Sequence, residues 1–440
     1  MQTIKYESEL SLKYTADVLV IGGGPSGVAA AVMCARQQLS KHGNRQPKVM
    51  LIEQSGCLGG ASVLAMVPEI MNFDDGENFL AGGFGREIHD ILFGECKYKR
   101  EWQNVRPEQL KRLYDRMIIE SGVELLLYTK AVNAVCDDSG KVKYAIASGP
   151  DGMYAISADY YIDCTGSASF CDLAGAESCY GDSAGIAMPA TLCSQWCGVD
   201  FERLNVQNRH LNDAYNEGIL SQYDTVLPGI KRNFPEHGVG GGNIGHCFDV
   251  DDRSAVSMTD ATVKGRMILS EYERYYRKYV EGCENAELLQ TATQLGIRES
   301  RRVKCEQMLT IDYFDGDKSF DDEIGRYSYP IDIHPMTADQ KGMLDFSKNV
   351  SKAHSSGGSY SISYRCLLPE NFSNLFVAGR CIGCDHEMTA SVRVIPGCYI
   401  TGQAAGIAAA LCSDEACDTK ALDYKKLRER LLKVGAYLSN

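Results

Sequence analysis

A glycine-rich turn directly after a short apolar run constrains this chain more than any other feature. Residues 18–21 are Val-Leu-Val-Ile, and residues 22–27 are Gly-Gly-Gly-Pro-Ser-Gly. The apolar run is typical of a buried parallel strand. Gly22 permits a tight turn, Gly24 lets the backbone approach a pyrophosphate, and Gly27 allows a helix to pack closely on the strand. The pattern predicts a Rossmann-type nucleotide-binding unit near the start of the chain.

An acidic residue follows where such a unit binds ribose. Residues 49–52 form a second apolar run that ends in Glu53, after a polar stretch at 37–47 that we expect to be a surface loop. A carboxylate at this position can accept hydrogen bonds from ribose hydroxyls. A glycine pattern alone is weak, but strand, glycines, helix, strand and acid in this order indicate a dinucleotide site.

Two further segments favour a flavin nucleotide over a nicotinamide nucleotide. A second glycine turn at residues 56–62 follows Glu53 and could bring backbone to the pyrophosphate or the flavin ring; the alternative is an ordinary loop. Near the other end, residues 374–380 precede a Thr-Gly-Gln-Ala-Ala-Gly segment at 401–406. These two segments can return the chain to the same nucleotide and complete its binding site. We therefore expect a flavoprotein.

The middle of the chain predicts the rest of an α/β fold. Helical spacing at 107–121, a strand at 123–128, a hairpin over 142–156 and a strand at 160–166 continue the first domain. The pattern then changes, with fewer glycine-bounded strands. Beyond that change we expect long helices at 259–280 and 286–296.

We therefore expect two domains. The predicted fold class is α/β: a Rossmann-type, glutathione-reductase-like FAD-binding domain at 1–187, closed by 366–440, with an α+β substrate domain inserted at 188–365.

Composition excludes several partners. The chain has 440 residues, of which 45 are Lys or Arg and 58 are Asp or Glu, a formal net charge of −13. An acidic chain is not expected to bind nucleic acid or an anionic membrane. We find no apolar run approaching the roughly 18 residues of a membrane span, and the first residues are too polar for a signal peptide. The 18 scattered cysteines fit reduced thiols, so we expect a cytoplasmic protein and leave homo-oligomerisation open.

Seven motifs together resemble one known family. They are GGGPSG at 22–27, GCLGGAS at 56–62, DCTG at 163–166, GIRESRR at 296–302, YRCLLP at 364–369, AGR at 378–380 and RVIPGCYITGQAAG at 393–406. The constellation resembles the FAD-dependent oxidoreductase family that includes many proteins labelled xanthan-lyase-like. It is more distantly similar to the heterodisulfide reductase flavin subunit and to fumarate reductase flavoproteins.

The resemblance implies FAD as the cofactor but leaves the substrate and the electron donor or acceptor open. The iron-sulfur cysteine runs and the C-x4-C disulfide of some relatives are missing, as is a histidine in 56–62 for covalent attachment. We therefore expect non-covalent FAD. The expected FAD contacts are Gly22, Gly24, Pro25, Ser26, Gly27, Glu53, Gln54, Ser55, Leu58, Gly59, Gly60, Ala131, Val132, Thr165, Gly166, Gly379, Arg380, Arg393 and Val394.

The resemblance also implies a geometry near the reacting end of the flavin. It places Arg393 and Val394 where relatives bring a helix amino terminus to the flavin pyrimidine, and His386 close to their active-site histidine. The alternative for His386 is a structural pair with a carboxylate. Positive charge and a helix dipole there would stabilise negative charge on the ring.

Three other positions are candidates for substrate chemistry, each with a structural alternative. Arg301, with Arg298 and Arg302 around Glu299, could bind a substrate carboxylate or form a salt-bridge network. Tyr364 could donate a proton or simply pack. His246 follows a glycine run and could line the pocket.

Two other motif matches are weaker indications of function. Residues 240–245 match GxGxxG, but no buried strand precedes them, so we expect a flexible loop rather than a second dinucleotide site. Cys381 and Cys384 have redox-pair spacing, yet two incidental small residues are the preferred interpretation. No zinc-type pair accompanies them, and no metal is expected.

The sequence therefore predicts an FAD oxidoreductase that moves a hydride between flavin N5 and a small organic substrate. The alternatives are an electron-transfer flavoprotein component that serves a protein partner, or a redox sensor that uses FAD only for stability.

Overall fold

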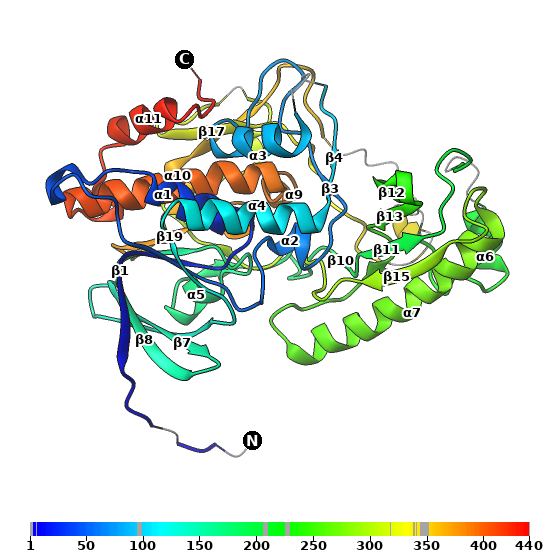
Figure 1. Cartoon of the computed structure of the whole chain (residues 1–440), viewed down its shortest axis with the longest axis horizontal. Helices are drawn as coiled ribbons and strands as arrows, with labels where there is room; N and C mark the ends of the chain where they lie inside the picture. The colour runs from blue at the N-terminus through cyan, green and yellow to red at the C-terminus, as the bar shows by residue number, and fades with distance from the viewer. Residues whose placement is uncertain are drawn as a thin grey trace.

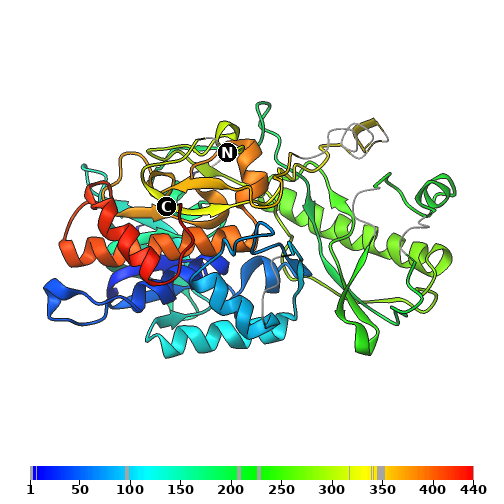
Figure 2. The ribbon, with the colours of Figure 1, turned by 90° about the horizontal axis from the view of Figure 1, so that it is seen from above.

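The computed structural model describes residues 3–5, 7–94, 99–205, 210–224, 229–316, 318–337, 339, 341–343 and 352–439. It has two bodies, a larger one that contains both chain ends and a smaller one, green in Figures 1 and 2, to its side.

A seven-stranded sheet forms the centre of the larger body. Its parallel part has the order β5-β2-β1-β8, with β19 also pairing with β8. The antiparallel β6-β7-β8 meander extends it, and the expected hairpin at 142–156 is its β7–β8 turn. The strands are β1 Leu12–Ile21, β2 Val49–Ile52, β5 Glu124–Leu126, β6 Lys130–Cys136, β7 Val142–Gly149, β8 Gly152–Asp163 and β19 Leu375–Val377.

Strand β1 is buried on both faces, as its apolar run predicts. Val18 and Val20 enter the core beneath the helices, whereas Leu19 and Ile21 enter a second core on the opposite face. All four side chains are buried. The sheet therefore has the Rossmann-type α/β architecture that the sequence predicts.

Two helices with small residues at their crossing cover one face of the sheet. Helix α1 (Pro25–Ala35) follows the glycine turn, and α10 (Ile395–Glu415) lies against it (Figure 1). A Cβ at Gly402 would lie 2.2 Å from the carbonyl oxygen of Ser26, and one at Gly406 would lie 2.1 Å from that of Ala30. Only glycine allows this approach.

Helix α10 is long and apolar enough to cross a membrane by length and composition, but its whole apolar window is buried inside the protein. The remaining elements of the larger body are α2 Gly60–Val63, β3 Glu69–Ile70, α3 Phe84–Phe93, β4 Gln103–Asn104, α4 Pro107–Glu120, α5 Ser169–Leu173, β9 Ser178–Cys179, β16 Arg302–Val303, β17 Glu323–Tyr327, β18 Tyr360–Ser363, α9 His386–Val392 and α11 Tyr424–Lys433, with short 3-10 turns at Ser40–His42, Ile311–Tyr313, Tyr364–Leu367, Gly379–Cys381 and Thr419–Ala421.

The smaller body is a four-stranded antiparallel sheet in the order β12-β13-β11-β15, with a long helix packed along it. The expected helix at 259–280 is α7, Ala255–Tyr279. The other elements are β10 Ala190–Thr191, β11 Ser194–Cys197, α6 Leu211–Asn216, β12 Ile230–Phe234, a 3-10 turn at Pro235–His237, β13 Val239–Gly242, β14 His246–Cys247 and β15 Glu287–Thr291.

The smaller body ends earlier than the expected boundary at residue 365. Its buried core residues lie between Ala190 and Leu295. Leu309, Tyr327 and Tyr360 instead belong to the core of the larger body. The segment after about residue 297 therefore returns to the FAD-binding body, and β17 and β18 pack there near α10.

Two local expectations were wrong. The stretch 286–296 contains strand β15 and no helix, because its residues pair with β11. The glycines at 240–242 form strand β13 rather than a flexible loop, since a Cβ on any of them would meet a neighbour within 2.3–2.5 Å. A paired strand cannot cradle a pyrophosphate, which supports the view that this motif is not a second dinucleotide site.

We expect Gly402→Ala to destabilise the fold. The added methyl group would meet backbone of α1, which cannot move aside as a flexible side chain can, and overpacking of this kind costs about 1–3 kcal/mol or more. Urea denaturation measures the loss. Gly229→Ala is the control, because a Cβ there meets nothing within 4 Å; equal stability of the two variants would contradict the close contact.

Candidate active site

One cavity of about 870 Å³ lies where the two bodies meet. The larger body contributes the glycine turn, Glu53 and the start of α10, and the smaller body contributes residues such as Thr191 and Asn243. Residues that are far apart in the sequence therefore share one continuous space.

The first glycine turn has the geometry that a pyrophosphate needs. Gly22 adopts φ +101°, and a Cβ there would lie 2.6 Å from the carbonyl oxygen of Cys164. Gly24 precedes α1, and a Cβ on it would meet only the Cα of Gly60, at 4.0 Å. The space over Gly24 is thus open to the cavity, and a side chain would fill it. The turn fits an anionic group that binds to backbone amides at a helix start.

Glu53 lies at the end of β2 and lines the same cavity. It is buried, and its carboxylate accepts hydrogen bonds from the backbone amides of Gly23 and Ser55, both at 2.7 Å. These bonds fix the side chain in place. A carboxylate has about four acceptor positions, so capacity remains for ribose hydroxyls.

Most of the expected FAD contacts line the cavity. They are Gly22, Gly24, Pro25, Ser26, Glu53, Gln54, Gly60, Ala131, Val132, Thr165, Gly166, Arg380, Arg393 and Val394. The lining does not include Gly27, Ser55, Leu58, Gly59 or Gly379. Gly27 and Gly379 instead permit close packing, against Gly22 and Ser26 respectively, and Leu58 is a core residue.

The start of α10 also lines the cavity, and Arg393 lies beside it. Its Nη2 donates to the backbone and side-chain oxygens of Asp332, at 3.2 and 3.4 Å. Its Nε is buried and has no hydrogen-bond partner among the described residues. A buried guanidinium N–H without an acceptor is costly, so this donor has capacity for a further acceptor.

A second arginine, Arg298, lines the cavity from the other side. It donates to the carbonyl of Pro189 and the hydroxyl of Thr191, at 2.7 and 2.8 Å, and to Asn243 at 3.1 Å. Burial, together with the neighbouring Arg393 charge, lowers the pKa of Arg298 to about 10, so it stays charged at neutral pH. The sequence pointed to this arginine cluster, but Arg301 was the residue expected to act.

Arg301 also lines the cavity, where it pairs with Asp172 at 3.0 Å. Arg302 does not, because its guanidinium pairs with Glu299 and donates to two backbone carbonyls. Residues 298–301, which carry these arginines, have irregular backbone. Arg302 therefore fits the interpretation of a salt-bridge network, whereas Arg298 and Arg301 line the cavity, as binding of a substrate carboxylate requires.

Three buried side chains and the partly exposed Asp332 form a hydrogen-bonded row that reaches the cavity. His246 Nδ1 lies 2.8 Å from Asp224 Oδ2, and His246 Nε2 lies 2.8 Å from His334 Nδ1. His334 Nε2 lies 3.3 Å from Asp332 Oδ2. His334 and Asp332 line the cavity, with His246 behind them. Sequence reasoning missed both; the Asp-x-His spacing is the signal that could have indicated one shared face of an extended segment.

His386 does not reach the cavity, contrary to the expectation drawn from the resemblance. Its Nδ1 lies 2.9 Å from Glu299 Oε1 and the side chain is 14% exposed. Burial alone would lower the pKa of His386, but the hydrogen bond and charge of Glu299 outweigh it and raise the pKa. The alternative of a structural pair with a carboxylate is the one that the geometry supports.

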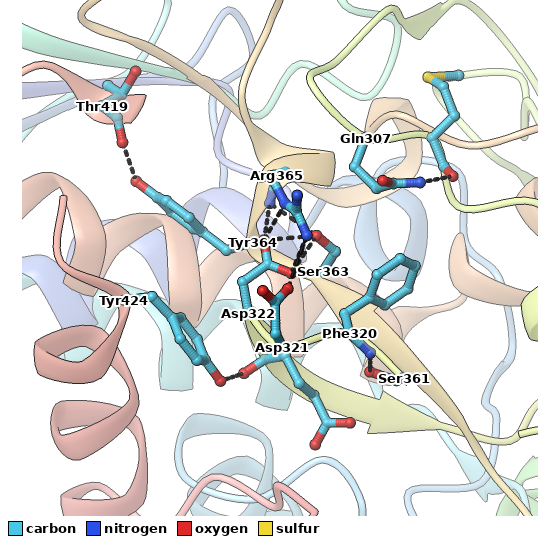
Figure 3. Close-up of polar contacts among 12 residues, drawn as sticks. Gln307, Phe320, Asp321, Asp322, Ser361, Ser363, Tyr364, Arg365, Thr419 and Tyr424 are labelled. Carbon is cyan, nitrogen blue, oxygen red and sulfur yellow. Dashed lines mark hydrogen bonds and ion pairs between the residues drawn. The ribbon is translucent and has the colours of Figure 1, made fainter. Parts of the chain in front are cut away.

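Tyr364 is also placed away from the cavity. Figure 3 shows its hydroxyl directed at Thr419, whose carbonyl accepts its hydrogen bond at 2.8 Å. The ring belongs to the core of the larger body, and burial raises the pKa of this phenol well above its usual value. The neighbouring Arg365 pairs with Asp321 and Asp322 in the same view. Tyr364 packs the fold and cannot donate a proton to a molecule in the cavity.

Cys381 and Cys384 are buried free thiols. Cys384 lies 3.1 Å from the hydroxyl of Thr389, and burial raises the pKa of both thiols, to about 12 for Cys384. Thiols of this kind are inert, which agrees with the preferred interpretation. Among the described residues, no three His, Cys, Asp or Glu side chains gather in a way that could hold a metal ion.

Comparison with known proteins agrees with this geometry. The sequence profile of the family described as "FAD dependent oxidoreductase" matches residues 17–431. The chain therefore belongs to the FAD-dependent oxidoreductase family. It is an enzyme of this class, and FAD is its cofactor. No curated protein matches the chain significantly.

Solved structures resemble it more distantly. A geranylgeranyl bacteriochlorophyll reductase-like protein from Thermoplasma acidophilum is 12% identical, with a TM-score of 0.47, over 96% of this chain and 84% of that one. The p-nitrophenol 4-monooxygenase PnpA from Pseudomonas putida DLL-E4 is also 12% identical, with a TM-score of 0.47, over 96% and 87%. THI4 of Thermovibrio ammonificans is 21% identical over 38% and 67%, with a TM-score of 0.29.

We expect Gly24→Val to remove FAD without unfolding the protein. The new side chain would occupy open space over the turn rather than clash with protein atoms. Flavin absorbance per chain measures binding, and circular dichroism measures folding. Gly229→Val, also in open space, should keep its flavin. A Gly24→Val protein with a full complement of FAD would refute the placement of the pyrophosphate.

His386→Gln should lose stability chiefly at low pH. Because the pKa of His386 is raised in the folded protein, its contribution is fully present below the unfolded value of about 6.5 and is lost as pH rises through the folded value. Urea denaturation at about pH 6 and about pH 9 should show a larger difference from wild type at the lower pH. Flavin content should stay unchanged. A difference that grows with pH would contradict the ion pair.

Proposed function

We propose that this enzyme moves a hydride between flavin N5 and a carbon atom of a small anionic organic substrate. The observation that supports this most is the continuity of the cavity. Its lining includes Glu53 and the first glycine turn as well as Arg298, Arg393 and His334.

The residues that would hold FAD are among those that line the cavity. Glu53 would bind ribose, the backbone around Ala131 and Val132 would contact adenine, and the amides at the start of α1 would bind the pyrophosphate. The start of α10 and Arg393 would lie at the flavin ring. Bound there, FAD supplies a two-electron carrier that accepts or gives a hydride at N5.

The charge of the cavity favours an anionic substrate. Six of its lining side chains are Lys or Arg and four are Asp or Glu, although the chain as a whole has a net charge of −13. Arg298 is nearly fully buried, and Arg393 keeps a buried N–H that has no acceptor within the described part of the chain. A carboxylate can accept hydrogen bonds from two guanidinium groups at once.

An experiment with small carboxylates separates hydride transfer from the alternative of an electron-transfer component. Anaerobic addition of small carboxylates to the purified yellow protein should bleach the flavin when one of them is a substrate. If no small molecule bleaches the flavin and a co-purified redox protein does, the alternative is correct.

FAD should be released intact by acid or heat. The turn at 56–62 has no histidine to form a covalent link, and the contacts that would hold the nucleotide are backbone amides and carboxylate oxygens. Absorbance and mass of the supernatant after acid precipitation measure this. Flavin retained on the denatured chain, or release of FMN, is the opposite outcome.

Arg298→Gln should weaken the binding of small carboxylates while FAD stays bound. Oxalate and malonate serve as probes, with the change in the flavin absorption spectrum as the readout. Loss of a charge-assisted hydrogen bond costs about 1.5–3 kcal/mol, so the dissociation constant should rise about tenfold or more. Arg116→Gln, on the exposed face of α4, is the control. Unchanged affinity of Arg298→Gln for these carboxylates would contradict the proposal that Arg298 binds the anion.

Arg393→Gln should lower the two-electron reduction potential of the bound flavin. A cation beside the ring favours the state with more negative charge. For two electrons, about 30 mV corresponds to about 1.4 kcal/mol, so a shift of tens of millivolts is expected. Reductive titration against a reference dye measures it. An unchanged potential would show that Arg393 does not lie at the ring.

A further inference from the structure

The last turn of α10 brings two cysteines together. The helix ends at Glu415, Ala416 adopts the left-handed conformation with φ +50°, and the backbone N–H of Cys417 donates to the carbonyl of Cys412 at 3.2 Å. This is the hydrogen bond of a Schellman helix end, in which the side chains of the two bonded residues frequently pack against each other. That contact is usually hydrophobic, whereas here both side chains are thiols.

Further contacts hold this pair in place. The hydroxyl of Tyr160 lies 3.0 Å from the carbonyl oxygen of Cys412 and 2.7 Å from that of Cys417, so one donor serves both residues. Cys412 belongs to the core of the larger body, and Cys417 packs against that core. The two thiols lie within hydrogen-bonding reach of each other. The backbone and Tyr160 therefore fix two sulfur atoms side by side.

The two thiols differ in exposure. Cys412 is fully buried, whereas Cys417 is half-buried between the exposed residues Ala416 and Asp418. A reagent from solvent can therefore reach Cys417, while the protein shields Cys412.

The acidity of the two thiols differs in the same sense. The hydrogen bond with Cys412 lowers the pKa of Cys417 to about 7, although burial and the carboxylates of Glu415 and Asp418 oppose this. The same hydrogen bond and burial raise the pKa of Cys412 well above its usual value. By contrast, burial raises the pKa of Cys136, which is also half-buried. Because the thiolate is the nucleophile, Cys417 is the more reactive sulfur of the pair.

We propose that Cys417 and Cys412 form a site of reversible oxidation, at which a hydroperoxide oxidises Cys417 and Cys412 then converts the product into a disulfide. Redox-sensor cysteines are solvent-accessible and often lie next to a resolving cysteine, as these two do. Ile395, at the start of α10, lines the cavity, whereas Cys412 and Cys417 lie at the other end of the helix. The site is therefore separate from the flavin chemistry and does not depend on the proposed hydride transfer.

The two steps balance. The thiolate of Cys417 attacks one oxygen of hydrogen peroxide, the O–O bond breaks and hydroxide leaves. Cys417 becomes a sulfenic acid, oxidised by two electrons, and the peroxide is reduced by two. The sulfur of Cys412 then attacks the sulfur of Cys417. An S–S bond forms, the S–O bond breaks, and the departing hydroxyl takes the thiol proton of Cys412 to become water.

Peptide mapping of the holoprotein tests the pairing. Reduced and desalted protein is treated with hydrogen peroxide, the remaining thiols are blocked with N-ethylmaleimide in denaturant, and the chain is cut after Lys, Arg and Glu. Cleavage after Glu415 leaves Cys412 and Cys417 on different peptides, so only a disulfide can keep them joined. Fragmentation distinguishes Cys412 from Cys398, which shares its peptide.

We expect the joined peptides after treatment with peroxide and their separation after treatment with dithiothreitol. Cys136→Ser should give the same joined peptides as wild type. A sulfinic or sulfonic acid at Cys417 without the joined peptides would overturn the role of Cys412. A disulfide from Cys417 to any other cysteine, or no oxidation of Cys417, would overturn the proposal.

Alkylation and trapping measure the two roles separately. At about pH 7, iodoacetamide should modify Cys417 about tenfold or more faster than Cys136, because its thiolate fraction is larger. This comparison is made within the wild-type protein, so it needs no variant to fold. Equal rates would overturn the assignment of Cys417 as the reactive thiol.

Cys412→Ser keeps a hydrogen-bond donor beside Cys417 but removes the resolving sulfur. In this variant the sulfenic acid of Cys417 should persist after peroxide and be trapped by dimedone, whereas wild type should give the disulfide and little adduct. Flavin absorbance per chain shows that the variant is folded. A folded Cys412→Ser protein that gives no more dimedone adduct at Cys417 than wild type would contradict the proposed order of the two steps.

Discussion

The close crossing of α1 and α10 is the contact on which the site depends. Gly402 and Gly406 lie against the backbone of Ser26 and Ala30, so the two helices approach as far as backbone allows. Both helices begin at the cavity, at Pro25 and at Ile395. The amino termini carry the positive ends of the helix dipoles. One packing contact thus fixes two sites for negative charge, one for a pyrophosphate and one for the ring and substrate end.

Buried cations at the second end need compensation, and the fold supplies it from both bodies. Arg298 is held by the carbonyl of Pro189, the hydroxyl of Thr191 and the amide oxygen of Asn243, all neutral acceptors. Arg393 is held by Asp332. Neutral hydrogen-bond acceptors hold a guanidinium in place without cancelling its charge. This difference leaves Arg298 as the less compensated cation, which is what recognition of an anion requires.

Local chemistry was predictable from the sequence and long-range assembly was not. The turn at residues 22–27 needs specific glycines whatever surrounds it, so its role follows from the order of the residues. By contrast, the strand at β15 was taken for a helix because its pairing partner, β11, lies about 90 residues earlier. The same reason hid His334, which meets His246 across 88 positions. The expectation that His386 reaches the site has another origin, since a family resemblance transfers a fold more reliably than the contacts of one side chain.

The row of histidines joins the two bodies and gives their contact a chemical consequence. Asp224 and His246 belong to the smaller body, and His334 and Asp332 follow the segment that has returned to the larger one. The contact between His246 Nε2 and His334 Nδ1, at 2.8 Å, is therefore a contact between the two bodies. Docking of the smaller body against the larger one thus brings four titratable side chains together, and two of them, His334 and Asp332, line the cavity that both bodies share.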